Sequence, residues 1–259
     1  MTEHNERVQQ SFTNQGNSFA TQPWTADGER IARLVASAHC TGTERVLDIA
    51  TGPGYIAEAF SRVAREVIGI DLTDAMLSIA ESRRNERKIS NLHFRNGDVR
   101  HLPFGGHEFD VVVCRFAFHH FEDPATVLAE MVRVCRHNGT ILVEDMIASE
   151  HPGRAAYQDQ FELLRDPSHT RSLPLSELLT VFRNAGLEVE TVAMASDLTP
   201  QADRWMSTTK TPPHRAAEIR SLLEEDRLHD FSGTRPYLDA SGTLHFHERT
   251  AIVTGRKFR

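Results

Sequence analysis

The sequence is poor in cysteine, and the few cysteines stand far apart. Among its 259 residues only Cys40, Cys114 and Cys135 are cysteines, and none belongs to a Cys-x-x-Cys pair. A disulfide framework needs a dense, even set of cysteines, and a structural zinc site needs paired thiols. This spacing argues against both classes and is typical of buried, reduced thiols.

Long apolar runs are also missing. No stretch approaches the roughly 20 apolar residues that cross a bilayer. The first residues, 1–6, are polar and contain no apolar region like that of a secretion signal. We therefore expect no membrane segment and a cytoplasmic location.

The chain has no excess of basic residues. It carries 29 lysines and arginines against 36 acidic residues, a net charge of -7. Binding to nucleic acid requires a basic surface, so we expect no nucleic-acid partner. With 39% hydrophobic and 25% charged residues, the chain can bury one large core, which favours a single domain with insertions. The oligomeric state stays open, with a homodimer as one option.

The most informative stretch that is present covers residues 45–55. An apolar strand ends at Asp48 and continues into a turn that contains Gly52 and Gly54. Glycine has no side chain to block a ligand and tolerates unusual dihedral angles, so such a turn lets the backbone approach a cofactor closely. We expect a nucleotide-like cofactor at this point.

The composition of the turn bears on which cofactor binds. Pro53 removes one N–H from the loop, and Asp48 would add negative charge near a pyrophosphate, so a cationic or zwitterionic cofactor is favoured. The spacing Gly52-x-Gly54-x-x-Ala57 nevertheless satisfies the loose dinucleotide pattern. The next strand ends at Asp71, roughly 20 residues further on, the offset of an acid that binds a ribose without a 2′-phosphate.

These residues resemble the class I S-adenosylmethionine-dependent methyltransferases, in the branch of the ubiquinone and menaquinone C-methyltransferases and many small-molecule methyltransferases. The resemblance rests on four blocks in the family's order, at residues 46–54, 69–77, 96–104 and 109–115. It implies S-adenosylmethionine as the cofactor and a small molecule as the methyl acceptor. Quinone-specific members commonly carry an Arg-Asn pair after the fourth strand, whereas this chain continues Arg115-Phe116, which leaves the acceptor open.

The resemblance also implies the roles of single residues. Glycines like Gly52 and Gly54 line the methionine part of the cofactor, and acids like Asp71 and Asp98 bind the ribose and the adenine amino group. Leu72 and Val99 would flank the adenine ring. The full set of expected cofactor residues is Asp48, Ala50, Gly52, Gly54, Asp71, Leu72, Met76, Asp98, Val99 and Arg115.

The order of expected elements predicts an α/β fold with helices on both faces of a parallel sheet. Strands are expected at 45–50, 67–71, 91–96, 109–114 and 140–145, separated by mostly helical stretches. The resemblance implies a Rossmann-like sheet of seven strands, in which the last strand is inserted antiparallel; Val189–Met194 and Arg249–Arg256 would supply the last two. Within the single domain, 1–40 would form N-terminal lid helices, 41–145 the cofactor-binding core, and 146–259 the substrate side, with an insertion before the last strand.

Histidines are the natural general bases for an acceptor that must lose a proton. His119 and His120 follow the fourth strand, and we favour His120 as the catalytic residue over His119. His169 and Arg171 are candidates for contact with the substrate, as is Phe19 among the aromatic residues of an N-terminal lid. The pair His245-x-His247 has no carboxylate or cysteine close in sequence, so no metal site is expected.

We therefore expect a methyltransferase that moves a methyl group to a small molecule by in-line displacement. Two alternative hypotheses about the function remain. The chain could bind S-adenosylmethionine for a different reaction, since the binding residues would be the same. An NAD-dependent oxidoreductase is disfavoured by Pro53 and by the lack of a Tyr-x-x-x-Lys pair.

Overall fold

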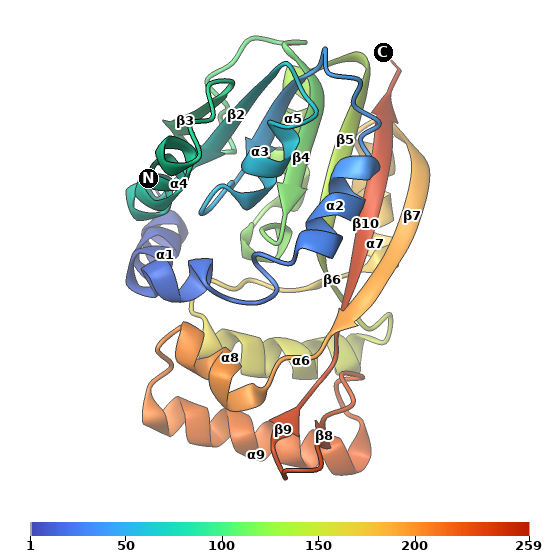
Figure 1. Cartoon of the computed structure of the whole chain (residues 1–259). Coiled ribbons are helices and arrows are strands. Elements are labelled where there is room, and N and C mark those ends of the chain that lie inside the picture. The colour runs from blue at the N-terminus through green and yellow to red at the C-terminus, as the bar shows by residue number, and fades with distance from the viewer. Residues whose placement is uncertain (1, 259) are drawn as a thin grey trace.

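Apolar strands and amphipathic helices alternate along the chain and build one central sheet (Figure 1). The computed structural model describes residues 2–258, except for the side chains of residues 17 and 195–197. The helices are α1 (Glu3–Ala20), α2 (Gly28–Ala36), α3 (Tyr55–Phe60), α4 (Asp74–Glu86), the 3-10 helix η1 (Phe118–His120), α5 (Pro124–Val134), α6 (Pro152–Arg165), α7 (Leu175–Asn184), α8 (Ala202–Thr208) and α9 (Pro213–His229). The strands are β1 (Arg45–Ile49), β2 (Glu66–Asp71), β3 (Leu92–Asn96), β4 (Phe109–Arg115), β5 (Cys135–Ala148), β6 (Leu173–Pro174), β7 (Leu187–Leu198), β8 (Tyr237–Leu238), β9 (Leu244–His245) and β10 (Glu248–Lys257).

The main sheet has the order β3-β2-β1-β4-β5-β10-β7, and the short β6 pairs with β5. The first five of these strands are parallel, whereas β10 is antiparallel to both β5 and β7. This is the expected arrangement, with the last strand inserted next to the end of the sheet. The order reverses beside β1, and ligands bind at such a switch point, beyond the carboxyl ends of the strands.

Apolar side chains on both faces of the sheet fix the helices in place. On one face, α2 and α3 pack against β1 through residues such as Leu34 and Phe60, which are fully buried. On the other face, α5 and α7 pack through residues such as Met131 and Phe182. Because helices cover both faces of the sheet, the sequences of its central strands are nearly continuous apolar runs.

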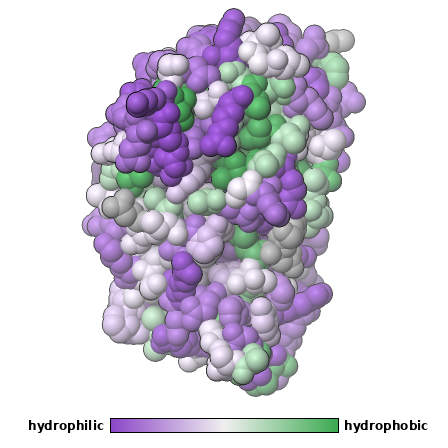
Figure 2. All heavy atoms as spheres, in the orientation of Figure 1, coloured by the Kyte–Doolittle hydropathy of each residue, from purple (hydrophilic) through white to green (hydrophobic). Residues whose placement is uncertain are grey.

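A helical lobe, which we define as α6, α8, α9 and the β8–β9 hairpin, lies below the carboxyl ends of the strands in Figure 1. It has its own apolar cluster, formed around Phe161, Trp205 and Phe246. Trp205 is 1% exposed. On the face shown in Figure 2, hydrophilic side chains predominate and the apolar ones form small groups between them. Among residues 2–258, no helix is long and apolar enough to cross a membrane.

Helix α1 lies beside α4, between the sheet and the lobe (Figure 1). It is kinked at Gly16, whose φ of 44° is left-handed. Polar contacts fasten it on both sides, because Asn5 donates to Asp98 at 2.9 Å and Ser11 donates to Asp166 at 2.8 Å. This helix thereby closes over the switch point of the sheet.

Candidate functional site

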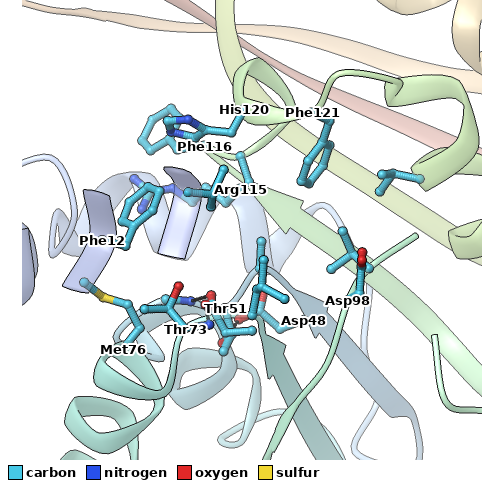
Figure 3. Close-up of a pocket in the computed structure, with 18 of the residues that line it drawn as sticks. Phe12, Asp48, Thr51, Thr73, Met76, Asp98, Arg115, Phe116, His120 and Phe121 are labelled. Carbon is cyan, nitrogen blue, oxygen red and sulfur yellow. Dashed lines mark hydrogen bonds between the residues drawn. The ribbon is translucent and has the colours of Figure 1, made fainter. Parts of the chain in front are cut away.

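A cavity of about 1130 Å³, counted to its open mouth, lies beyond the carboxyl ends of β1, β2 and β4. Figure 3 shows Asp48, Thr51 and Thr73 on one side of it and Phe12, Phe116 and His120 opposite. Of the residues expected from the sequence to bind the cofactor, those that line the cavity are Asp48, Ala50, Gly52, Asp71, Leu72, Met76, Asp98, Val99 and Arg115. The structure therefore brings nine of the ten together.

Gly54, the tenth, is needed by the packing behind the cavity. Its φ of 80° is left-handed, and it stands directly before α3. A Cβ at this position would lie 2.8 Å from Cζ of Phe94, a contact too short for any side chain to be accommodated without movement. Gly54 thus shapes the turn without belonging to the cavity wall.

The turn after β1 is wound in the left-handed region at more than one residue. Gly52 has a φ of 54°, and Ala50 has a φ of 51°. The left-handed conformation costs a residue with a Cβ about 1–2 kcal/mol. Ala50 therefore stores strain in a loop that lines the cavity.

Asp48 is the buried anchor of this turn. Its Oδ2 accepts hydrogen bonds from Thr51 Oγ1 at 2.5 Å and from the backbone N–H of Ala57 at 3.1 Å. Burial raises the pKa of Asp48 to about 7, although these hydrogen bonds oppose the rise. The carboxyl group can therefore change its charge near neutral pH.

Asp71, at the end of β2, is fixed by backbone groups from two loops. Its Oδ2 accepts from the N–H of Gly52 at 2.8 Å, and its Oδ1 accepts from the N–H of Thr73 at 2.9 Å. Burial raises its pKa against these hydrogen bonds. The side chain of Thr73 and the backbone of Leu72 also interact with this carboxylate, so the acid is held closely where it lines the cavity.

Asp98 follows β3 and lies at another part of the cavity in Figure 3. Arg100 forms an ion pair with it, with Nη2 at 2.6 Å from Oδ2, and Asn5 of α1 donates to the same oxygen. Burial acts to raise the pKa of Asp98, but the hydrogen bonds from Arg100 outweigh it and the pKa is lowered. The carboxylate is therefore charged and already well supplied with donors.

Arg115, at the end of β4, joins the sheet to the segment after α1. Its Nε donates to Glu144 Oε2 at 2.8 Å, and its Nη1 and Nη2 donate to the carbonyl oxygens of Thr25 and Trp24 at 3.2 and 2.9 Å. The pair with Glu144 is buried. The side chain of Arg115 thus pins the N-terminal segment over the cavity.

A second, smaller cavity of about 500 Å³ adjoins the first, since the two share wall residues. The shared residues are Phe12, Phe19, Phe116 and His120. The rest of its wall comes from α1 and the segment after it, from η1, from β5, β7 and β10, and from the helical lobe with the residue after α6. It includes Trp24, His119, Arg165, Asp166, Trp205 and Glu248. A ligand that spans both cavities would pass beside His120.

The two adjacent histidines have different surroundings. Nδ1 of His119 lies 2.7 Å from Oδ1 of Asp145, and although burial acts to lower the pKa of His119, Asp145 outweighs it and the pKa is raised. Nδ1 of His120 lies 3.0 Å from the carbonyl oxygen of Ser168, and burial, together with the neighbouring His119, lowers the pKa of His120. His120 is therefore neutral, while His119 has a buried carboxylate as its partner.

The expected substrate residues differ in position. Phe19 lines both cavities. His169 and Arg171 line neither, because His169 is buried against Asp159 at 2.9 Å and Arg171 is at the surface beside Glu177. His245 lies 3.3 Å from Asp239, a carboxylate that sequence spacing did not single out.

Several wall residues were not named as site residues from the sequence. Thr51 and Thr73 lie inside the recognised blocks, so attention to every polar residue of a block would have found them. Arg100 likewise lies inside a recognised block, whereas His4, Asn5 and Thr25 belong to no pattern that marks a ligand site. Glu248 and Asp166 reach the second cavity only through the tertiary structure.

Comparison with known proteins gives a consistent result. Residues 47–143 match the family described as the methyltransferase domain. The chain is 34% identical over 212 residues to the uncharacterized methyltransferase YcgJ of Bacillus subtilis, covering 82% of this chain and 83% of YcgJ. A demethylmenaquinone methyltransferase of Thermotoga maritima is 33% identical over 46% of this chain and 49% of its own length.

Solved structures agree with these relatives. The crystal structure of YcgJ superposes with a TM-score of 0.82 at 31% identity, covering 89% of this chain and 99% of that chain. A putative methyltransferase from Bacillus halodurans superposes with a TM-score of 0.83 at 27% identity over the same shares. The similarity thus extends beyond the cofactor half to most of the chain.

Proposed function

The chain belongs to the class I S-adenosylmethionine-dependent methyltransferases, and from that premise we propose which of its residues hold the cofactor and which receive the acceptor. The enzyme transfers a methyl group to a small molecule. When bound, S-adenosylmethionine supplies a methyl group on a sulfonium that is a good leaving group. The protein's own residues then have to bind the cofactor and the acceptor, orient them for in-line transfer, and exclude water from the site.

Asp71 carries the proposal for the cofactor site. Backbone N–H groups of Gly52 and Thr73 hold its carboxylate at the end of β2, where it lines the cavity and can accept hydrogen bonds from the hydroxyl groups of a ribose. Leu72 and Val99 line the same cavity and supply apolar contacts for an adenine ring. The methionine end of the cofactor would lie against the turn of Asp48, Ala50 and Gly52, with Met76 as a further wall.

Asp98 is the proposed acceptor for the adenine amino group. Because Arg100 and Asn5 already donate to its carboxylate, we expect the Arg100 side chain to turn aside when the cofactor binds. Arg115 contributes by holding the N-terminal segment in place, as its guanidinium donates to Glu144 and to two carbonyl oxygens.

The second cavity is the proposed site of the acceptor. It joins the first beside His120, whose neutral imidazole would not repel a sulfonium. Phe12 and Phe19 of α1 close both cavities from the same side. His120 and His119 are the proposed catalytic residues, and the proposal does not extend to His169 and Arg171, which lie outside both cavities.

We propose in addition a cytoplasmic enzyme of one domain that does not act on nucleic acid. The net charge of -7 and three free cysteines, two of them buried, support these points. Residues 1–40 would act as the lid, 41–145 as the cofactor-binding core and 146–259 as the substrate side.

A homodimer would form at the edge strand β7, where Val192 and Met194 are exposed, and analytical ultracentrifugation tests it.

The test of the cofactor site is isothermal titration calorimetry with S-adenosylhomocysteine on the wild type and Asp71→Ala. We expect the variant to bind about 100-fold more weakly, because it loses charge-assisted hydrogen bonds worth about 3 kcal/mol together. Asp74→Ala, at the exposed start of α4, is the matched control and should bind like the wild type. Equal binding by Asp71→Ala, or a preference of the wild type for NADH, would contradict the proposed site.

A further inference from the structure

The second cavity has the form of a chamber with aromatic walls. Its rings are Phe12, Phe19, Trp24, Phe116 and Trp205, which come from α1, the segment after it, the end of β4 and the helical lobe. Phe116 has a φ of 52°, a conformation that is strained for a bulky residue. Such strain persists where the surrounding structure requires it, and here it sets a ring at the junction of the two cavities. The walls therefore suit a flat, apolar body.

Two of the charged groups of the chamber, Asp166 and Arg165, already have partners in the protein. Asp166 accepts hydrogen bonds from Ser11, Gln15 and Ser168. Arg165 stacks on the ring of Trp205 and donates to the carbonyl oxygen of the same residue. A charged acceptor would find no unpaired counter-ion among these groups.

Glu248 is the remaining acid of the chamber wall, and it lies against Glu162 of the lobe. Burial raises the pKa of Glu248, and burial together with the neighbouring Glu248 raises the pKa of Glu162 well above its usual range. Both shifts favour the protonated form of these carboxyl groups. The chamber favours a neutral acceptor, because burying an isolated charge is costly.

His119 is the chamber residue that is equipped to take a proton. Its Nδ1 lies 2.7 Å from Oδ1 of Asp145, and backbone N–H groups of Phe118 and Met146 fix that carboxylate. With Nδ1–H donating to Asp145, Nε2 carries the free lone pair, and within residues 2–258 no hydrogen bond to Nε2 is formed. This is the orientation that a buried aspartate gives to a general base.

We infer that the chamber binds a neutral aromatic acceptor with an ionisable hydroxyl group, and that His119, oriented by Asp145, removes the hydroxyl proton as the methyl group is transferred. This inference rests on the proposed function. It assigns the base to His119 in preference to His120, which sequence reasoning favoured.

The step balances as an O-methylation. The acceptor oxygen forms a bond to the methyl carbon while the bond from that carbon to sulfur breaks, and the electron pair stays on sulfur. The proton of the hydroxyl group moves to Nε2 of His119 and later passes to solvent. The products are a methyl ether and neutral S-adenosylhomocysteine, so no oxidant or further reactant is needed.

The pH dependence follows from the groups that face His119. Asp145 on β5, Asp166 after α6 and Glu248 on β10 raise its pKa, against burial, which lowers it; His120 and His169 are the neighbouring imidazoles. Because the base must be neutral, transfer should increase as pH rises through a pKa above the ordinary 6.5. An enzyme that positions a neutral amine would not need this group.

The test uses 4-nitrophenol as the probe, because its phenolate absorbs visible light and reports where the proton is. The probe is titrated into the complex of the protein with S-adenosylhomocysteine, below the pKa of the free phenol. We expect binding with a phenolate fraction at least tenfold above that of the free probe. His119→Gln should abolish this increase, and Asp145→Asn should reduce it about tenfold, since the loss of the neighbouring charge lowers the pKa of His119.

His214→Gln, at an exposed histidine of α9, is the matched control and should behave like the wild type. Failure of 4-nitrophenol to bind, an unchanged phenolate fraction in His119→Gln, or tenfold tighter binding of the cationic 4-nitrobenzylamine would each overturn the inference. Calorimetry with S-adenosylhomocysteine on the same samples separates the two ideas. If that ligand does not bind the wild type, the proposed cofactor site fails instead.

Discussion

The cofactor cavity and the acceptor chamber lie side by side but are built in different ways. Among the residues that the structure describes, all those that line the cofactor cavity lie between His4 and Val127, and its key acid, Asp71, is held by backbone N–H groups of nearby loops. The chamber draws its wall from residues 12 to 248, and side chains from distant elements hold its acids, as Ser11 holds Asp166. We therefore expect that the lobe side can be changed while the cofactor side is kept.

The variant Trp205→Ala should have the largest effect, a loss of stability in the helical lobe, and it tests whether the two regions are independent. The indole is almost fully buried in the apolar cluster of the lobe, and Arg165 stacks on it. Removing such a side chain costs about 3–5 kcal/mol. Hydrogen exchange should show a loss of protection in α9 of about 100-fold to 4,000-fold, because each factor of ten corresponds to about 1.4 kcal/mol.

The same variant should bind S-adenosylhomocysteine within about threefold of the wild type, since no lobe residue lines the cofactor cavity. Trp205→Phe retains most of the apolar volume and should keep most of the protection of α9. If calorimetry shows that Trp205→Ala loses cofactor binding in step with lobe stability, the two regions form one cooperative unit and the comparison fails.

A second, smaller effect should come from Asp48→Asn and should depend on pH. Burial raises the pKa of Asp48 to about 7 in the folded protein, above its value of 3.8 when exposed. Between these values the folded state holds more protons than the unfolded state, so the contribution of Asp48 to stability falls as pH rises and is lowest above pH 7. The asparagine avoids this penalty, so the variant should gain stability relative to the wild type by up to about 1.4 kcal/mol per pH unit from pH 5 to 7.

Urea unfolding of the cofactor-free protein at several pH values from 5 to 8 measures this difference. Asp74→Asn, in the exposed first turn of α4, supplies the background of an acid-to-amide change outside the cavity. A stability difference between wild type and Asp48→Asn that does not change with pH would contradict the raised pKa of Asp48 in the folded protein.

The same contrast explains what the sequence could predict. The sheet and most residues of the first cavity could be predicted, because each follows from consecutive residues: a strand, its terminal acid and a turn. The antiparallel last strand was expected from the family resemblance. Asp48 and Asp71 stand at the ends of β1 and β2, where parallel strands place their carboxyl ends at one edge. Local order along the chain is enough to bring these groups together.

The residues of the acceptor chamber could not be predicted from local sequence in this way. His169 lies close to His119 in space, with ring centres 5.6 Å apart, yet it turns toward Asp159 and away from the chamber. Glu248 reaches the chamber because β10 is inserted next to β5, and Trp205 because the lobe folds beneath the sheet. The choice between His119 and His120 depends on Asp145, a partner 26 residues away along the chain. None of these contacts has a periodic or local signal.

The smallest expected effect concerns the backbone strain of the turn after β1, and it is measured as a change in stability. Ala50 lines the cavity with a φ of 51°, where a Cβ costs about 1–2 kcal/mol and glycine has no such penalty. Ala50→Gly should therefore stabilise the protein by about 0.5–1 kcal/mol, after the greater freedom of glycine in the unfolded chain is subtracted. Ala129→Gly, at an exposed site inside α5, should have the opposite sign, with a loss of about 0.5–1 kcal/mol. Urea midpoints of the two variants decide the matter: if both fall, the left-handed Ala50 is not strained, and the turn owes its shape to Gly52 and Gly54 alone.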